Sequence, residues 1–162
     1  MHMKNKITRL SITILFILLF LYTGISKILN YEQYASEIQQ SPLLKIIPIW
    51  AVWIIPVIEL IVAIMLLTRE WRLKGFYICC LLMVLFTFYV IGVNQFSYYI
   101  PCSCGGLIDS LPGNIHILLN GLLVVLAMLG IYLEKNVRKS IRSYKNITQT
   151  MPGLPHQAMK GI

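Results

Sequence analysis

The chain has 162 residues, of which 57% are hydrophobic and only 12% are charged, and its mean hydropathy is +0.73. A soluble domain is about 25% charged, so this composition excludes an ordinary soluble enzyme and indicates a membrane protein. The formal net charge of +8 would suggest nucleic acid in a soluble protein, but in a membrane protein basic loop residues fix the orientation, so we expect no nucleic-acid partner.

Four segments are long and apolar enough to cross a bilayer, which takes about 20 residues per helix. They run over residues 10–29, 46–68, 75–96 and 115–133. Each should be an α-helix, because a chain in lipid has to satisfy its own backbone hydrogen bonds. The predicted fold class is therefore an all-α membrane protein, a four-transmembrane-helix bundle over residues 10–133. Pro48 suits a first helical turn, and Pro56 is expected to kink the second span.

The segments outside the four spans are polar. Residues 1–9 form a basic N-terminus, and residues 134–162 form a basic tail that we expect to be disordered. The first span has the basic start of a secretory signal, but its apolar run is long for one and no A-x-A cleavage site follows. We therefore interpret the first span as a transmembrane helix.

The basic residues are distributed unevenly between the two sides of the membrane. Three regions hold most of them, before span one, between spans two and three, and after span four: Lys4, Lys6, Arg9, Arg69, Arg72, Lys74, Lys135, Arg138, Lys139, Arg142, Lys145 and Lys160. Lys27 and Lys45 flank the first loop, and the loop after span three has none. The positive-inside rule then predicts a multi-pass protein of the bacterial inner membrane with both termini in the cytoplasm.

Cys102 and Cys104 lie in the periplasmic loop after span three, in the polar stretch PCSCGGLIDS over residues 101–110. A disulfide joins Cα atoms about 4.4–6.8 Å apart, which residues two apart reach only where the backbone turns. Gly105 and Gly106 allow the dihedral angles of such a turn. The ring would be small and strained, and strained, exposed disulfides exchange readily. In the periplasm, where disulfides persist, this favours a redox pair over a structural staple.

Other interpretations of this loop stay open. The cysteines could form a passive disulfide or remain thiols, or they could join Asp109 and His116 in a metal site. Zinc sites of this kind normally include a second ligand pair, which this side of the sequence lacks, so we expect no metal. His116 opens span four and Asn120 follows one turn later on the same face. A histidine there could stabilise a thiolate or carry a proton, or it could lie at the water interface without a role.

Glu59 is the single carboxyl group in the second span. Such a residue is costly in a membrane, faces the bundle interior and is a functional candidate. If the span begins at residue 46, Glu59 lies about 20 Å deep, whereas Lys27 at the outer end of span one should extend toward water. A Lys27–Glu59 pair would require the second helix to begin later. A tyrosine or the carbonyl freed by Pro56 is the alternative partner.

Cys79 and Cys80 are adjacent near the inner end of span three. Neighbouring residues on a helix point about 100° apart, so these cysteines should not bond to each other. More than 20 helical residues, or about 30 Å, separate them from Cys102. We expect them to be packing residues.

Three local motifs resemble the MauE branch of the DoxX-like membrane proteins. Residues 24–27, GISK, resemble the family's G-x-x-K, and residues 56–60, PVIEL, resemble its P-x-x-E-L. Residues 102–104, CSC, resemble its C-x-C near the outer end of span three, although glycine follows here where the family often has an aromatic residue. The resemblance covers all four spans, over residues 7–133.

This resemblance implies a four-helix membrane protein with a redox role. In methylamine utilisation, such a protein is thought to act with a thioredoxin-like partner during disulfide formation in the dehydrogenase, and related domains resemble disulfide-handling proteins such as the vitamin K epoxide reductase group. For this chain, the resemblance implies exchange between Cys102 and Cys104 and a periplasmic thioredoxin-like protein, within membrane lipid.

The leading hypothesis is a thiol–disulfide oxidoreductase component in which one cysteine attacks and the other resolves a mixed disulfide. The supporting residues are His116, Asn120, Glu59 and Lys27. A quinone could occupy a bundle with an interior carboxyl group, although no residue specifies it. The alternatives are a non-catalytic assembly factor with a structural disulfide and a small proton-coupled carrier built on Glu59. Four spans without an inverted repeat argue against the carrier.

Overall fold

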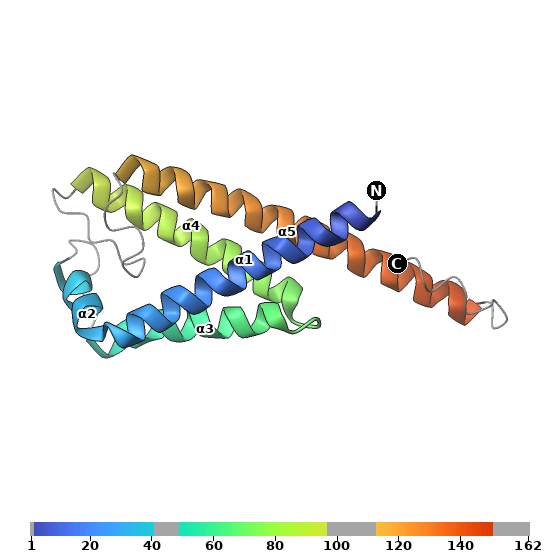
Figure 1. Cartoon of the computed structure of the whole chain (residues 1–162), viewed down its shortest axis with the longest axis horizontal. Coiled ribbons are helices and arrows are strands. Elements are labelled where there is room, and N and C mark those ends of the chain that lie inside the picture. Colours follow the sequence, from blue (N-terminus) through green and yellow to red (C-terminus); the bar gives the residue numbers. More distant parts are fainter. Residues whose placement is uncertain (1, 41–48, 97–112, 151–162) are drawn as a thin grey trace.

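The computed structural model describes residues 2–40, 49–96 and 113–150, which are helical apart from short turns (Figure 1). The elements in chain order are α1 (His2–Leu29), α2 (Tyr31–Gln40), the 3₁₀ helix η1 (Ile49–Trp53), α3 (Ile54–Leu67), α4 (Arg72–Phe96) and α5 (Gly113–Thr150). The described residues thus confirm the all-α fold class.

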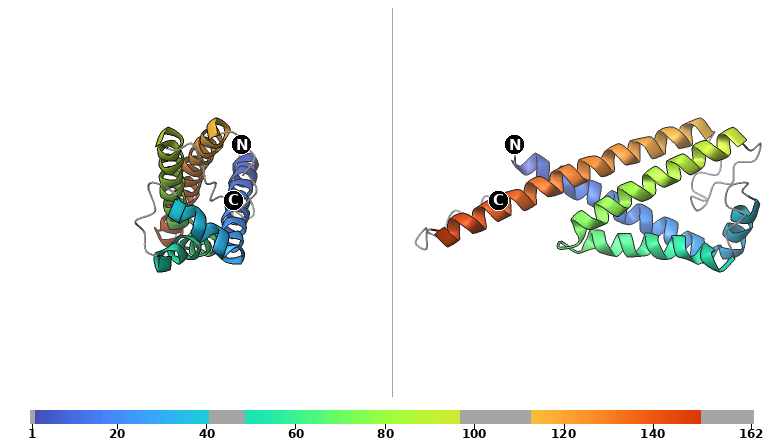
Figure 2. Two further views of the ribbon diagram at one scale, coloured as in Figure 1. Left: turned by 90° about the vertical axis from the view of Figure 1, so that its left-hand side faces the viewer. Right: turned by 180° about the vertical axis from the view of Figure 1, so that it is seen from behind.

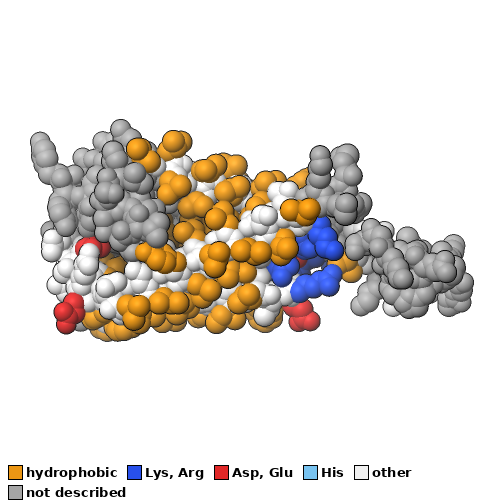
Figure 3. All heavy atoms as spheres, in the orientation of Figure 1, with side chains coloured by type: hydrophobic (Ala, Val, Ile, Leu, Met, Phe, Trp, Pro, Cys, Tyr) orange, Lys and Arg blue, Asp and Glu red, His pale blue; other side chains and the backbone are white. Residues whose placement is uncertain are grey.

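Three helices are long and apolar enough to cross a membrane. The spans are Lys6–Leu29 in α1, Arg72–Gly92 in α4 and Ile117–Ser143 in α5. Large apolar side chains such as Leu18, Phe88 and Leu118 point outward, and apolar side chains cover much of the face seen in Figure 3. An apolar surface of this extent suits lipid and not water. These helices define a multi-pass membrane protein.

The second span differs from its prediction. In place of one helix over 46–68, η1 is followed by α3, which begins at Ile54 and has 14 residues, so it is a shorter apolar helix. Pro56 does not kink this helix, because it lies in the first turn, where a missing N–H costs no hydrogen bond. Pro48 lies outside the described residues. The prediction of four full-length spans is confirmed only for three of them.

The helices pack as two antiparallel pairs. α1 lies along α3, α4 lies along α5, and a short turn from α3 to α4 joins the pairs (Figures 1 and 2). α1 crosses α5 near the end of the bundle at which α1 begins, which we call the N-terminal end. α2 lies at the opposite end, called the α2 end (Figure 1). Because the chain reverses at each connection, α3 begins, α4 ends and α5 begins at the α2 end.

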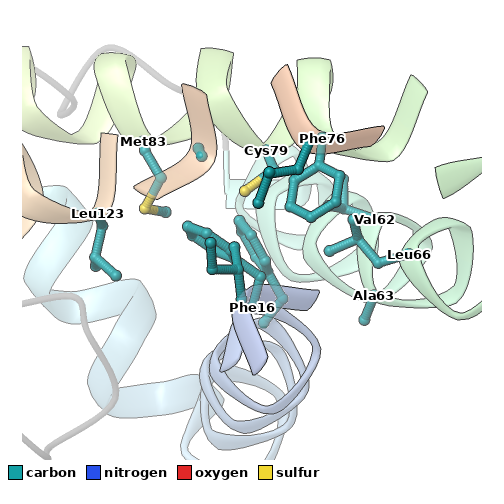
Figure 4. Packing of buried hydrophobic residues seen from close by; sticks show 12 residues of the cluster. Phe16, Val62, Ala63, Leu66, Phe76, Cys79, Met83 and Leu123 are labelled. Atoms are coloured by element: carbon teal, nitrogen blue, oxygen red, sulfur yellow. The ribbon is translucent and has the colours of Figure 1, made fainter. Parts of the chain in front are cut away.

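The core between the pairs is aromatic and tightly packed (Figure 4). Phe16 of α1 meets Phe76 of α4 edge to face, with 6.3 Å between ring centroids. Cys79 is fully buried beside this pair as a free thiol, and Cys80 packs partly buried against the same cluster. This confirms that Cys79 and Cys80 are packing residues that do not bond to each other.

Gly130 of α5 provides the space for the Phe76 ring. A Cβ at residue 130 would lie 2.5 Å from the ring, whereas a Cβ at Gly121 of the same helix would have no atom within 4 Å. We therefore expect Gly130→Ala to lower the free energy of unfolding by about 1–3 kcal/mol, because the ring is buried and cannot move aside. Gly121→Ala should be neutral or raise it by up to about 1 kcal/mol through helix propensity.

Denaturation of the two purified variants in one detergent measures this difference. Equal stabilities for Gly130→Ala and Gly121→Ala would contradict the close approach of α4 and α5 at Phe76.

The start of the polar tail was predicted to be disordered, but it is helical. α5 continues without a break from the membrane span to Thr150, and Figure 1 shows its last turns extending beyond the other helices. Residues 134–150 contain neither glycine nor proline, and the first helix-breaking residues are Pro152 and Gly153. The prediction for residues 151–162 lies outside the described residues.

Candidate functional site

A buried ion pair joins α1 to α3 near the α2 end. The side chains of Lys27 and Glu59 are 5% and 1% exposed, and Lys27 Nζ donates a hydrogen bond to Glu59 Oε1. The expectation that Lys27 extends toward water was therefore wrong, as was the depth assigned to Glu59. Because α3 begins at Ile54, Glu59 lies in its second turn, level with the end of α1.

The two short motifs of α1 and α3 meet at this pair. Gly24 lies one turn before Lys27, and Pro56 lies one turn before Glu59, so each motif presents both of its defining residues on one helix face. A Cβ at Gly24 would lie 3.1 Å from the Leu60 side chain and 3.4 Å from the carbonyl oxygen of Pro56. Gly24 therefore lets α1 approach α3 closely enough for the ion pair to form.

Aromatic rings enclose the Lys27 ammonium group. Lys27 Nζ lies 5.7 Å from the centroid of the Tyr34 ring in α2 and 5.3 Å from that of the Phe86 ring in α4. Both distances are within the range of cation–π attraction. Burial, and secondly the Glu59 carboxylate, raise the pKa of Tyr34 well above its usual value. Its hydroxyl therefore keeps its proton at neutral pH and remains a hydrogen-bond donor.

Two buried polar atoms near this level lack a hydrogen-bond partner among the described residues. They are Glu59 Oε2 and Asn120 Nδ2, and Asn120 is 5% exposed. α4 and α5 run antiparallel with Phe76 against Gly130, which places Asn120 opposite Phe86 in the same register. Buried polar groups are normally paired. The four helices thus bring an amide donor and a carboxylate acceptor, both unsatisfied, to one level of the bundle.

The other predicted site residues lie mostly outside the described residues. Cys102, Cys104 and Asp109 belong to the connection between α4 and α5. His116 lies in the first turns of α5, one turn before Asn120, but its side chain is not described. The structure therefore brings Lys27, Glu59 and Asn120 to one level and leaves the predicted cysteine pair untested.

The sequence predicted an unspecified tyrosine as an alternative partner of Glu59, but it did not identify Tyr34, Phe86 or Gly24 as neighbours of the pair. The signal for Gly24 was present in G-x-x-K, because glycine and lysine three residues apart share a helix face. Nothing in the sequence indicated Tyr34 or Phe86, because α2 was not predicted and the register between α1 and α4 depends on tertiary packing.

These features define a class: a helical membrane protein with several spans, outward apolar faces and an ion pair buried between its first long helix, α1, and the shorter apolar helix α3. The chain belongs to the MauE family, since the family model described as methylamine utilisation protein MauE matches residues 5–133. That range runs from α1 to the end of the apolar part of α5 and includes all three motifs. No curated protein and no solved structure matches the chain.

Proposed function

We propose that this MauE-family protein is a thiol–disulfide exchange component of the inner membrane that works through Cys102 and Cys104. The thiolate of one cysteine attacks the disulfide of a periplasmic thioredoxin-like partner, forming a mixed disulfide and releasing one partner thiolate. The second cysteine then displaces the partner, which leaves as a dithiol while Cys102 and Cys104 become the disulfide. The reverse sequence oxidises the partner, and the difference in reduction potential sets the direction.

The observation that carries this proposal is where the cysteine segment is attached. Its flanking residues, Phe96 and Gly113, lie at the α2 end, the same end as the Lys27–Glu59 pair. Cys102 is six residues beyond Phe96, so it lies within about 20 Å of the end of α4. A redox pair in a segment attached at the same end as a buried polar site suits transfer of electrons and protons between a periplasmic partner and the membrane interior.

The proposed orientation rests on charge and length. Arg9, Arg72 and Arg138 gather at the N-terminal end, as expected for the cytoplasmic side. Together α3 and η1 are about 30 Å long, enough for a fourth crossing. With four crossings, both termini lie in the cytoplasm and Cys102 and Cys104 in the periplasm. The family name connects the chain with methylamine utilisation. The proposed exchange does not require that substrate, because the partner could pass disulfides to any protein that it matures.

The reduction potential of Cys102 and Cys104 tests the exchange function. Membranes equilibrated in dithiol buffers and then alkylated should show one reversible two-electron transition between about −120 and −270 mV, the range of exchangeable protein disulfides. Alkylation of Cys79 and Cys80 must be distinguished from that of Cys102 and Cys104. The measurement is therefore repeated in a variant that carries both Cys79→Ala and Cys80→Ala. A transition below about −300 mV would indicate a structural disulfide and would favour the assembly-factor alternative.

A quinone is the cofactor that we propose for the buried site. Bound there, a quinone would supply an acceptor for two electrons and two protons. The residues fit its carbonyl oxygens, because Asn120 Nδ2 is a buried donor without an acceptor among the described residues and Tyr34 is a protonated phenol. Glu59 Oε2 has no hydrogen-bond donor within bonding distance among those residues. Asn120→Leu should slow reoxidation of the reduced pair by a soluble quinone at least tenfold and leave the potential of Cys102 and Cys104 unchanged. An unchanged rate would exclude Asn120 from quinone binding.

A further inference from the structure

A second buried polar cluster lies at the N-terminal end, opposite the proposed redox site. Glu134 of α5 is 2% exposed, and its Oε2 atom lies 2.9 Å from Nη1 of Arg9 in α1. Its Oε1 atom lies 3.6 Å from Nε of Arg138, one turn further along α5. The carboxylate therefore holds the crossing of α1 over α5 in place.

Positive charge exceeds negative charge in this cluster, which we call the arginine cluster and define as Arg9, Arg69, Arg72 and Arg138 around Glu134. Arg72, the first residue of α4, lies within electrostatic range of the other four members. Four guanidinium groups thus share one buried carboxylate. Even with exposed Glu70 included, the group keeps a net positive charge, and basic side chains gather at this end in Figure 3.

Backbone carbonyls position two of these guanidinium groups but add no compensating charge. Arg72 Nε donates to the carbonyl of Leu66 at 3.0 Å. Arg138 Nη2 donates to the carbonyls of Arg69 and Glu70 at 3.0 and 2.8 Å. The end of α3 and the turn that follows it therefore hold these side chains in a fixed arrangement, which reduces the entropy cost of binding an anion.

The cluster also has unused hydrogen-bond donors. The Nε atoms of Arg9 and Arg138 are buried and make no hydrogen bond within the described parts of the chain, although Arg138 Nε lies 3.6 Å from Glu134 Oε1 in their ion pair. A buried guanidinium N–H without an acceptor is costly. An anion with several acceptor oxygens would satisfy both the free donors and the surplus charge, and phosphate suits planar guanidinium groups particularly well.

Neighbouring aromatic residues place the cluster at the level of lipid headgroups. Trp71, adjacent to Arg72, is 51% exposed, with Lys74 Nζ 4.7 Å from its ring centroid. Lys135, adjacent to Glu134, lies 5.3 Å from the ring of exposed Tyr77. Tryptophan, tyrosine and lysine gather where the hydrocarbon meets the headgroups. The available anion at that depth is a phospholipid phosphate.

We propose that the arginine cluster binds the phosphate group of an anionic phospholipid in the leaflet at the N-terminal end. The phosphate oxygens accept hydrogen bonds from the guanidinium groups of Arg9, Arg72 and Arg138, and the acyl chains lie along the exposed apolar faces of α1 and α5. This site is separate from the proposed redox site and does not depend on it.

The test uses the full-length protein in a neutral detergent, with lipid binding followed by native mass spectrometry and unfolding followed by heating. Phosphatidylglycerol should bind in a 1:1 ratio and raise the unfolding midpoint by about 5 °C at saturation, while phosphatidylcholine should not. Arg138→Gln should weaken phosphatidylglycerol binding at least tenfold. Arg142→Gln, one turn further along α5 and exposed, is the matched control and should change binding less than twofold.

Glu134→Gln keeps the proposal testable if the arginine variant is unstable. It removes the cluster's own carboxylate, so phosphatidylglycerol should bind more tightly and stabilise this variant more than the wild type. Equal stabilisation by both lipids, or equal losses in Arg138→Gln and Arg142→Gln, would overturn the site. If inorganic phosphate stabilised the protein as much as phosphatidylglycerol does, the cluster would be a site for free phosphate and the proposal of a phospholipid would be wrong.

Discussion

Replacing Cys104 by serine should abolish disulfide exchange and trap the protein on its partner. If Cys102 attacks first, the mixed disulfide forms normally but no second thiolate is present to resolve it, so the complex accumulates. Turnover should fall at least a hundredfold, because the resolving thiol is lost and not merely weakened. Cys102→Ser should be equally inactive but should trap little complex. If the attacking roles are reversed, the trapped variant is Cys102→Ser.

The measurement is a non-reducing gel of membranes mixed with a purified thioredoxin-like protein from the same host, with turnover followed by partner thiol content. Cys79→Ala and Cys80→Ala are the matched controls, since both side chains pack against the core as free thiols. Full activity in both serine variants would reject the redox function. If the serine variants were active and stable, the assembly-factor alternative would be favoured. If Glu59→Gln alone abolished function, the proton-coupled carrier would be favoured.

Hydropathy predicts α1, α4 and α5 well because each contains more than 20 residues without a proline. It fails for α3, where apolar composition extends from residue 46 but Pro56 restricts where the helix begins. Apolar composition indicates which residues are favourable in lipid, whereas the residue at which a helix begins depends on local backbone geometry. The wrong helix start is why Glu59 was predicted to lie far from Lys27.

The pairing of Glu134 could not be predicted for a different reason. Arg9 is 125 residues away along the chain, and either residue considered alone looks like an ordinary charge flanking a membrane span. Only the crossing of α1 over α5 brings them together. By contrast, the motifs around Gly24 and Pro56 were visible in sequence, and a spacing of three residues is the spacing of neighbours on one face of a helix.

Lys27→Met should lower the free energy of unfolding by about 3–5 kcal/mol, because it leaves the Glu59 carboxylate buried without its partner. Methionine is unbranched like lysine and shorter by one atom, so most of the packed volume is kept and the loss mainly reports the removed charge. Lys139→Met, on an exposed part of α5, is the control and should change stability by less than about 0.5 kcal/mol. Chemical denaturation in detergent measures both variants.

The double variant Lys27→Met with Glu59→Leu distinguishes a structural pair from a functional one. Replacing both charges by apolar side chains removes the unpaired carboxylate, so stability should return to within about 1 kcal/mol of the wild type. If the pair serves only to hold α1 against α3, activity should return with stability. We expect activity to remain lost, because the double variant lacks the Glu59 carboxylate, whose Oε2 atom has no hydrogen-bond partner among the described residues and lies level with Asn120, where we propose proton and electron transfer. A double variant that is both stable and active would remove the ion pair from the mechanism and leave Cys102 and Cys104 to act alone.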